Sequence, residues 1–449
     1  MLSLSVVFVV VVALFVAYAL SLPIAQTFAI AVVVVGLDLL LRYLYLVWKK
    51  QKPRNFLFPD KRLVRLQLIR SLSVLAVIAM GKALWMWIML VPAQSFDDPA
   101  EKADLLARRT YLLQNVTSAH FGPSDLPLYL PEIMRREWTI GTLSMTTAAL
   151  TNLAYEYPET RADAVRAIRG MIRRMLAKDL RDFEYYYWKE DSLDSLDGPH
   201  GHAGYLGHLN WMLAAYRLLG GGDEFTQLNR EISAALARRI EESPSHYIET
   251  FPGYIFVPDT AAVVASLALS GQLENERYRN AVQKWVAYTR AHLIEPISGV
   301  IYPWVNSQGQ GYGPPRGSYA SWNGFFLPWI DASFAQEQYQ VLHKHFVAEL
   351  PCGAAALREY LPGVHASGDI DSGPVIFGLS TSGSGFVLSS AKRNRDWALY
   401  SGLLKTAEGA GFSWNTAEGK RYLLAPIIGD AIVLAMRTSR DWDRRFVTG

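Results

Sequence analysis

Long hydrophobic runs separated by short polar segments dominate the start of the chain. Residues 2–22 contain no charged side chain, and this length is sufficient for a helix to cross roughly 30 Å of hydrocarbon. A second run covers residues 24–47, and a third covers residues 71–92, where Lys82 interrupts it. The pattern therefore predicts a transmembrane anchor of about three helices over residues 1–92.

The polar segment between the second and third runs is strongly basic. Residues 49–70 hold most of the Lys and Arg side chains of the predicted anchor. Cytoplasmic loops of membrane proteins carry an excess of these residues, so this loop is expected in the cytoplasm. We therefore expect an integral protein of the inner or plasma membrane, with its large domain on the extracytoplasmic side.

Beyond residue 93 the pattern changes to helical periods separated by loops rich in glycine and proline. Relatively apolar helices alternate with more charged, amphipathic ones, which is the pattern that an inner ring of helices wrapped by an outer ring requires. The predicted helices cover residues 138–155, 159–178, 203–220, 223–242, 258–272, 275–293, 320–334 and 335–349. The sequence thus predicts a mainly α fold, in which the transmembrane helices are followed by an (α/α)6-toroid-like domain over residues 93–449.

The segments between these helices carry the strand-like and aromatic stretches. Short strands are expected at residues 300–304, 375–380 and 421–428. Long aromatic loops cover residues 183–202, 243–258, 295–319 and 360–374. Because the loops of a toroid gather at one mouth and function concentrates on loops held by a rigid scaffold, we expect the functional site there.

Charge and cysteine content narrow the function classes. The chain of 449 residues has a net charge of +3, but residues 1–92 carry +8, which leaves −5 for the remainder. The large domain therefore offers no basic surface for nucleic acid. Cys352 is the only cysteine, so neither an intrachain disulfide nor a cysteine metal site is expected. The expected partners are a small-molecule substrate and the lipid bilayer, and a homo-oligomer stays open.

The densest group of candidate residues lies between residues 182 and 210. Aromatic side chains stand there beside carboxylates and imidazoles, which suits the binding of a polar or unsaturated small molecule. His208, at a predicted helix start, could act as an acid or base. His200, His202 and His208 could also bind a metal, but their spacing matches no strong motif, so neither a metal nor another cofactor is predicted.

Three further groups precede later helices. Glu249 and Asp259 flank a Pro-Gly turn, and Asp259 also suits the N-cap of the following helix. A glycine-rich aromatic loop leads into a helix at residues 302–324, with Arg316 as its only charge. Asp369 and Asp371 lie between glycines, and such carboxylate pairs can divide acid and base roles when their pKa values differ.

The run from Tyr205 to about Phe346 resembles the linalool dehydratase/isomerase family. The resemblance begins at GHLN, continues through Pro252 and the Phe256–Val257 pair, and includes LIEPISGVIYPW and the helix ending in Asp331. It implies an α/α toroid and cofactor-free addition or removal of water at a terpene alcohol. The family histidine falls on His208, and its two cysteines fall on Thr250 and Asp259, so this chain lacks both thiols.

The leading hypothesis is therefore a membrane-anchored enzyme with lyase or isomerase chemistry on a small amphipathic or terpenoid-like alcohol. The candidate catalytic residues are His208, Asp259, Asp371 and Glu249. The candidate substrate-binding residues are Tyr187, Trp188, Asp191, Tyr205, Thr250, Tyr254, Tyr319 and Trp322. Two alternatives remain: a carbohydrate-active enzyme that uses paired carboxylates, and a membrane-tethered binding module without catalysis.

Overall fold

The computed structural model describes residues 69, 99–364 and 366–447. The three predicted membrane spans and the basic loop at residues 49–70 lie outside these residues. Within the described part of the chain, none of the helices combines the length and the apolar character needed to cross a membrane.

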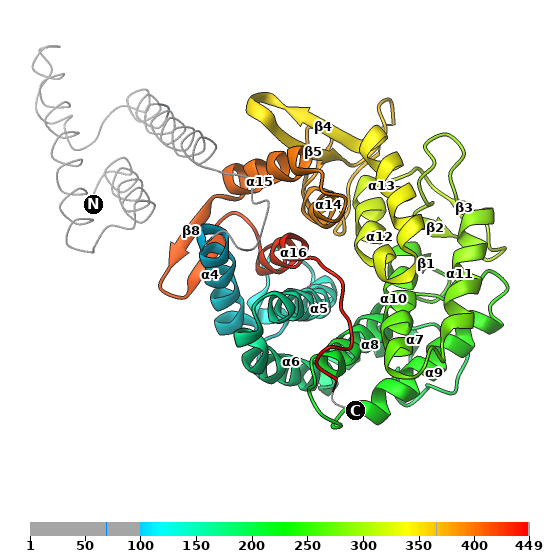
Figure 1. Cartoon of the computed structure of the whole chain (residues 1–449). Coiled ribbons are helices and arrows are strands. Elements are labelled where there is room, and N and C mark those ends of the chain that lie inside the picture. Colours follow the sequence, from blue (N-terminus) through cyan, green and yellow to red (C-terminus); the bar gives the residue numbers. More distant parts are fainter. Residues whose placement is uncertain (1–68, 70–98, 365, 448–449) are drawn as a thin grey trace, which may run out of the picture. The chain divides into compact units, whose positions relative to one another are not determined.

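Twelve long helices of the described chain form two concentric rings (Figure 1). The inner ring consists of α5 (Glu132–Glu156), α8 (Ala203–Leu218), α10 (Val257–Leu273), α12 (Gly317–Ile330), α14 (Thr381–Arg393) and α16 (Ile427–Arg437). The outer ring consists of α4 (Pro99–Val116), α6 (Arg161–Met175), α9 (Thr226–Glu242), α11 (Arg279–His292), α13 (Ala332–Phe346) and α15 (Trp397–Gly411). Each inner helix packs on the next one, and α16 closes the ring against α5. The predicted (α/α)6 toroid is therefore confirmed.

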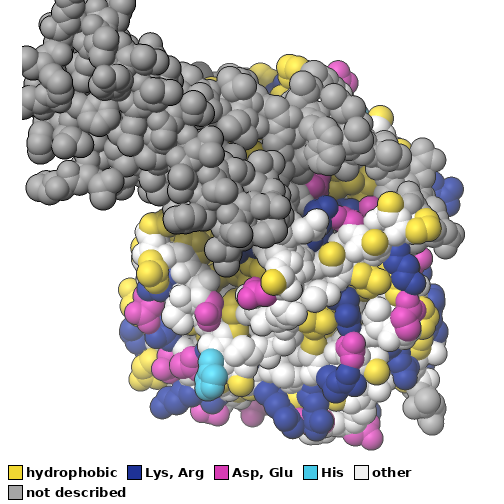
Figure 2. Space-filling view, turned by 90° about the vertical axis from the view of Figure 1, so that its left-hand side faces the viewer, with side chains coloured by type: hydrophobic (Ala, Val, Ile, Leu, Met, Phe, Trp, Pro, Cys, Tyr) yellow, Lys and Arg dark blue, Asp and Glu magenta, His cyan; other side chains and the backbone are white. Residues whose placement is uncertain are grey.

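The apolar and charged patterns separate the two rings for a physical reason. An inner helix has neighbours on every side, so it can be apolar around its whole circumference. In α10, for example, every residue from Thr260 to Leu267 is buried. An outer helix faces water on one side: α6 exposes Arg169 and Arg173, which both form ion pairs with Glu224. Figure 2 shows the same principle on one face of the molecule, where basic and acidic side chains are interspersed.

Inner and outer helices alternate along the chain, so the inner helices run in one direction and begin at the same face. The segments before them carry α7 (Lys178–Trp188) and the strands. The strands form three antiparallel sheets: β1 (Ile255–Phe256), β2 (Trp304–Val305) and β3 (Gly311–Tyr312); β4 (Val347–Leu350), β5 (Ala354–Arg358), β7 (Leu379–Ser380) and β6 (Val375–Ile376); β8 (Ser413–Thr416) and β9 (Gly419–Tyr422). We call the face at which the inner helices begin the mouth of the toroid.

Several predicted boundaries are wrong. The helix expected at residues 138–155 begins six residues earlier, at Glu132. The strand expected at residues 421–428 ends at Tyr422, because Pro426 fixes a backbone angle suited to a helix start and Ile427 begins α16. The helix expected at residues 335–349 gives way to β4 at Val347, where a β-branched residue enters a strand.

Candidate active site

The segments that precede the inner helices contact one another at the mouth. The backbone N–H of Ala203, at the start of α8, donates to the carbonyl of Glu249, which lies before α10 (3.1 Å). The short strands β1 and β2 join the segments before α10 and α12. A bridge between Arg316 and Tyr360 joins the segments before α12 and α14. Residues far apart in the sequence are thereby brought to one place.

Three carboxyl groups converge at the mouth, each from a different segment. Glu137 stands in the second turn of α5, Asp259 in the first turn of α10, and Asp371 in the segment before β6. Burial raises the pKa of Glu137 well above its ordinary value, and the charges of Asp371 and Asp259 raise it further. The three groups therefore lie within electrostatic range. All three side chains keep some exposure to solvent.

The other two carboxyls also have raised pKa values. Burial raises the pKa of Asp259 to about 7, although the hydroxyl of Thr250 donates to its Oδ2 at 2.8 Å and opposes the rise. Burial, followed by the charge of Asp369, raises the pKa of Asp371 to about 6. The phenol of Tyr319 donates to Asp371 Oδ2 at 2.7 Å and limits that rise. Near neutral pH the site therefore holds both protonated and ionised carboxyls.

Arg316 holds the segment that carries Asp371. Its guanidinium donates to the buried carboxylate of Glu359 (Nε to Oε1, 2.7 Å) and to both oxygens of Asp369 (2.5 and 2.6 Å). Asp369 Oδ1 in turn accepts the backbone N–H of Asp371 (3.1 Å). Burial acts to raise the pKa of Asp369, but the bonds from Arg316 keep it below its ordinary value. Arg316 and Asp369 thus position Asp371.

His208 and Asp259 were expected to act as a pair, but each has its own partner. His208 is buried, its Nδ1 lies 2.8 Å from the hydroxyl oxygen of Ser144, and its ring lies near Trp322 and Phe326. Burial lowers its pKa to about 4, so the imidazole is neutral. Among the described residues, no hydrogen bond joins His208 to Asp259. Each of the two groups therefore bonds to a side chain other than the expected partner.

Several other candidate residues have structural contacts. Tyr205 is fully buried and its phenol donates to the carbonyl of Met175 (2.7 Å). Asp191 forms an ion pair with Arg181 (2.7 Å). Glu249 accepts the backbone N–H of Gly253 across the Pro-Gly turn (3.0 Å). These contacts stabilise the segments around the mouth.

The aromatic candidates differ in how far they reach solvent. Tyr254 is exposed, whereas Trp188 is buried against the rings of two histidines. Tyr187 lies against the ring of Phe251, and burial together with the charge of Glu137 raises its pKa, which places it beside the carboxyl cluster. Trp322 stacks on a phenylalanine of α14. Tyr187 thus lies within electrostatic range of Glu137.

Glu137 is the member of the carboxyl cluster that the sequence prediction missed. The predicted helix began at Trp138, so Glu137 fell outside the expected elements. A signal was present nevertheless: Glu137 is the last charge before eighteen residues without any, from Trp138 to Tyr155. A carboxyl directly before so long an uncharged stretch lies close to the buried part of the helix, where charged side chains are rare.

Comparison with known proteins gives few relatives. No protein-family model and no curated protein matches the sequence. Among solved structures, the chain is similar to an unsaturated glucuronyl hydrolase specific for heparin, with 11% identity and a TM-score of 0.49, over 75% of this chain and 97% of that one. It is also similar to a family 105 glycoside hydrolase from C. acetobutylicum ATCC 824, with 13% identity and a TM-score of 0.39, over 66% and 92% of the two chains.

The expected membership of the linalool dehydratase/isomerase family is therefore wrong, and with it the expected lyase or isomerase reaction: the similar solved structures are glycoside hydrolases. The GHLN motif that suggested the family has a packing explanation. A Cβ on Gly207 would lie 2.8 Å from Val263 Cγ2, so glycine permits the close approach of α8 to α10. The amide of Asn210 bonds to Ser233 and Ser266 inside the core.

Proposed function

We propose that the chain is a carbohydrate-active enzyme that hydrolyses a glycosidic bond at the mouth of the toroid. The observation that carries the proposal is the convergence of Glu137, Asp259 and Asp371. The charges of Asp371 and Asp259 raise the pKa of Glu137, and the charge of Asp371 also raises that of Asp259. Glycoside hydrolysis by the common route needs one carboxyl that holds a proton and a second that has lost it. This site supplies both states near neutral pH.

The roles follow from the order of the pKa values. Glu137, whose pKa is raised well above its ordinary value, keeps its proton and donates it to the glycosidic oxygen as that bond to the anomeric carbon breaks. Asp371, with a pKa of about 6, is ionised and takes a proton from the water that attacks the anomeric carbon. One C–O bond is broken and one is formed, and the two carboxyls exchange protonation states. The charge of Asp371, with that of Asp259 when it is ionised, favours the protonated form of Glu137.

The side chains around the carboxyls suit a sugar ring. Tyr187 borders Glu137, Tyr254 presents an exposed ring, and Trp304 packs against Tyr312 beside the same segments. Flat aromatic faces give contact area to the apolar faces of a sugar, while phenol groups can bond to its hydroxyls. The net charge of −5 that remains outside residues 1–92 disfavours a densely sulfated or phosphorylated polymer as the substrate.

A non-catalytic binding module fits the site less well. That alternative predicts ordinary structural hydrogen bonds for His208, which the bond to Ser144 satisfies. It gives no reason for three carboxyls that repel one another, because keeping such groups together costs folding free energy. Raised pKa values of this kind concentrate at catalytic sites.

The test is a screen of the full-length chain against neutral and uronic-acid oligosaccharides, with new reducing ends as the readout. We expect at least one substrate to be cleaved, and Glu137→Gln and Asp371→Asn to lower the rate by about 10²–10⁴-fold. Asp197→Asn is the matched control, since Asp197 is an exposed carboxylate of the segment before α8. Cleavage that persists in both variants, or no cleavage of any oligosaccharide, would overturn the proposal.

A further inference from the structure

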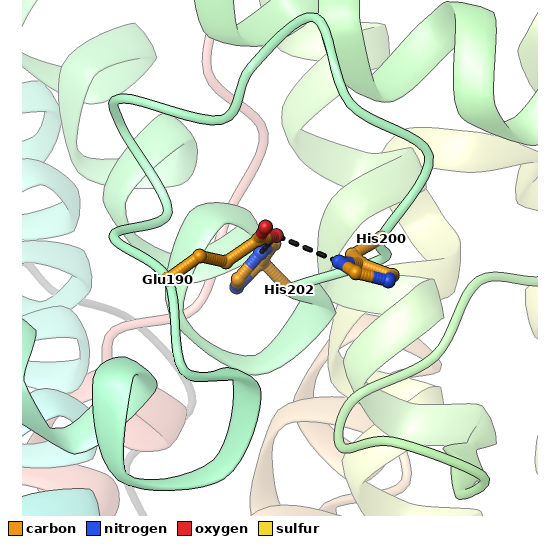
Figure 3. Close-up of side chains that lie close together, drawn as sticks. All are labelled: Glu190, His200 and His202. Carbon is orange, nitrogen blue, oxygen red and sulfur yellow. Dashed lines mark hydrogen bonds and ion pairs between the residues drawn. The ribbon is translucent and has the colours of Figure 1, made fainter.

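A second group of polar side chains lies between α7 and α8, outside the carboxyl cluster. Glu190 Oε1 lies 2.8 Å from Nδ1 of His200 and 2.9 Å from Nε2 of His202. All three atoms lie within 4.8 Å of one another. Figure 3 shows the two imidazoles directed toward the same carboxylate. One oxygen atom therefore faces two ring nitrogens at once.

His202 has a carboxylate at both of its ring nitrogens. Its Nδ1 lies 2.6 Å from Oε2 of Glu184, and both of these side chains are completely buried. A neutral imidazole carries a single N–H, so it can donate to only one of the two carboxylates. If Nδ1–H donates to Glu184, the lone pair of Nε2 faces the carboxylate of Glu190. Something positive is then required between Nε2 and that carboxylate.

We propose that Glu190, His200 and His202 bind one first-row divalent cation, with Zn²⁺ as the preferred ion. Two imidazole nitrogens and one carboxylate oxygen form a ligand set that zinc uses in proteins, with a fourth position left for water. Glu184 supplies the remaining element, since a metal-bound histidine commonly donates its other ring N–H to a carboxylate. The cation would offset the negative charge of the Glu190 carboxylate, which otherwise faces the lone pair of His202 Nε2.

The distances require only a small adjustment. Zinc lies about 2.0–2.2 Å from such ligands, so two ligand atoms of a tetrahedral site stand about 3.4 Å apart. The observed 2.8 and 2.9 Å would widen by about 0.5 Å. The side chains of His200 and Glu190 are 46% and 32% exposed and can move, whereas His202 is fixed by its burial. Ser195 Oγ, 3.5 Å from Nε2 of His202, borders the same space.

The surrounding charges leave room for a cation. The charge of Glu190 acts on Arg239, but the guanidinium of Arg239 bonds to backbone carbonyls, including that of Ser195 (2.8 Å). Among the described residues, no Lys or Arg forms an ion pair with Glu190. The sequence did not predict a metal here, because the spacing of His200, His202 and His208 matches no strong motif. In the structure His208 bonds to Ser144, and Glu190 completes the group with His200 and His202.

The test is calorimetric titration of the full-length chain with Zn²⁺, after purification by a tag without histidine and removal of metal by a chelator. We expect one equivalent to bind. His200→Gln and Glu190→Gln should each weaken binding at least about tenfold, and Glu184→Gln about 10–100-fold. Added Mg²⁺ should not compete, because it prefers all-oxygen ligands.

His343→Gln is the matched control. His343 forms a single surface pair with Asp396 (3.2 Å), without a third ligand, so this change should leave zinc binding unaltered. Because His200 is exposed, the His200→Gln chain is expected to fold, and its circular dichroism should match that of the parent. If the parent binds no zinc saturably, or if His200→Gln and Glu190→Gln bind it as the parent does, a proton rather than a metal links His202 to Glu190 and the proposal fails.

Discussion

Replacement of Arg316 by methionine tests whether this side chain organises the mouth. The guanidinium is 1% exposed, and its partner Glu359 is fully buried, whereas its second partner, Asp369, is 42% exposed. Most of the lost stability should therefore come from the unpaired carboxylate of Glu359, which would keep the bonds from the backbone N–H and the hydroxyl of Ser318. Leaving a buried charge without its partner costs about 3–5 kcal/mol.

The assay is thermal unfolding followed by circular dichroism. At about 2 °C per kcal/mol for a domain of this size, Arg316→Met should lower Tm by about 6–10 °C. Adding Glu359→Gln removes the unpaired charge, so the double variant should recover more than half of the loss. The recovery distinguishes electrostatics from lost packing, because the methionine is present in both chains.

Arg290→Met is the matched control. Arg290 also forms an ion pair, with Glu337 (2.6 Å), and also lies over an aromatic ring, that of Phe334 (4.4 Å to the centroid). Both partners of this pair are at least one-third exposed, so its loss should cost no more than about 1 kcal/mol. Equal Tm changes for Arg316→Met and Arg290→Met, or no recovery with Glu359→Gln, would refute the reasoning.

Two further predictions concern packing and pH. Gly207→Ala should lower the free energy of unfolding by about 1–3 kcal/mol, and the Gly207→Ala/Val263→Ala chain should recover part of this loss. Gly271→Ala is the control and should be tolerated, because a Cβ at Gly271 would meet nothing closer than 3.8 Å. The measurement is the urea midpoint of each chain. In the folded state the pKa of Asp259 is about 7, above its ordinary value of 3.8. The folded state therefore binds more protons than the unfolded state between these values, and stability falls as pH rises through that range. Asp259→Asn should lessen this fall in stability. Thr250→Val should extend it to higher pH, because it removes the hydrogen bond that favours the ionised form of Asp259. If the three chains gave parallel curves of stability against pH from about pH 5 to about pH 8, the prediction would be contradicted.

The sequence alone determined the architecture of the large domain. Apolar helices such as residues 258–272 alternate with charged ones such as residues 223–242, and this alternation reflects which helices are enclosed and which face water. The pattern weakened after residue 349, where α14 to α16 were not predicted, because short strands and glycines interrupt the periodicity. Boundaries such as the start of α5 depended on contacts between segments rather than on local pattern.

The candidate site, like the fold, was predicted only in part from the sequence. The sequence marked Asp259, Asp371 and Tyr319 as candidates, because each lies in a polar or aromatic segment next to a predicted helix. It could not show that Asp371 bonds to Tyr319, or that Glu137 stands within range of both aspartates.

Only closure of the ring decided which side chains meet. Glu137 and Asp371 are more than two hundred residues apart, and they act on each other because α5 and the segment before α14 reach the same mouth. Burial there raises the pKa of each carboxyl, and burial is a property of the assembled rings rather than of any local segment. Residue type and spacing along the chain contain no information about such a neighbour.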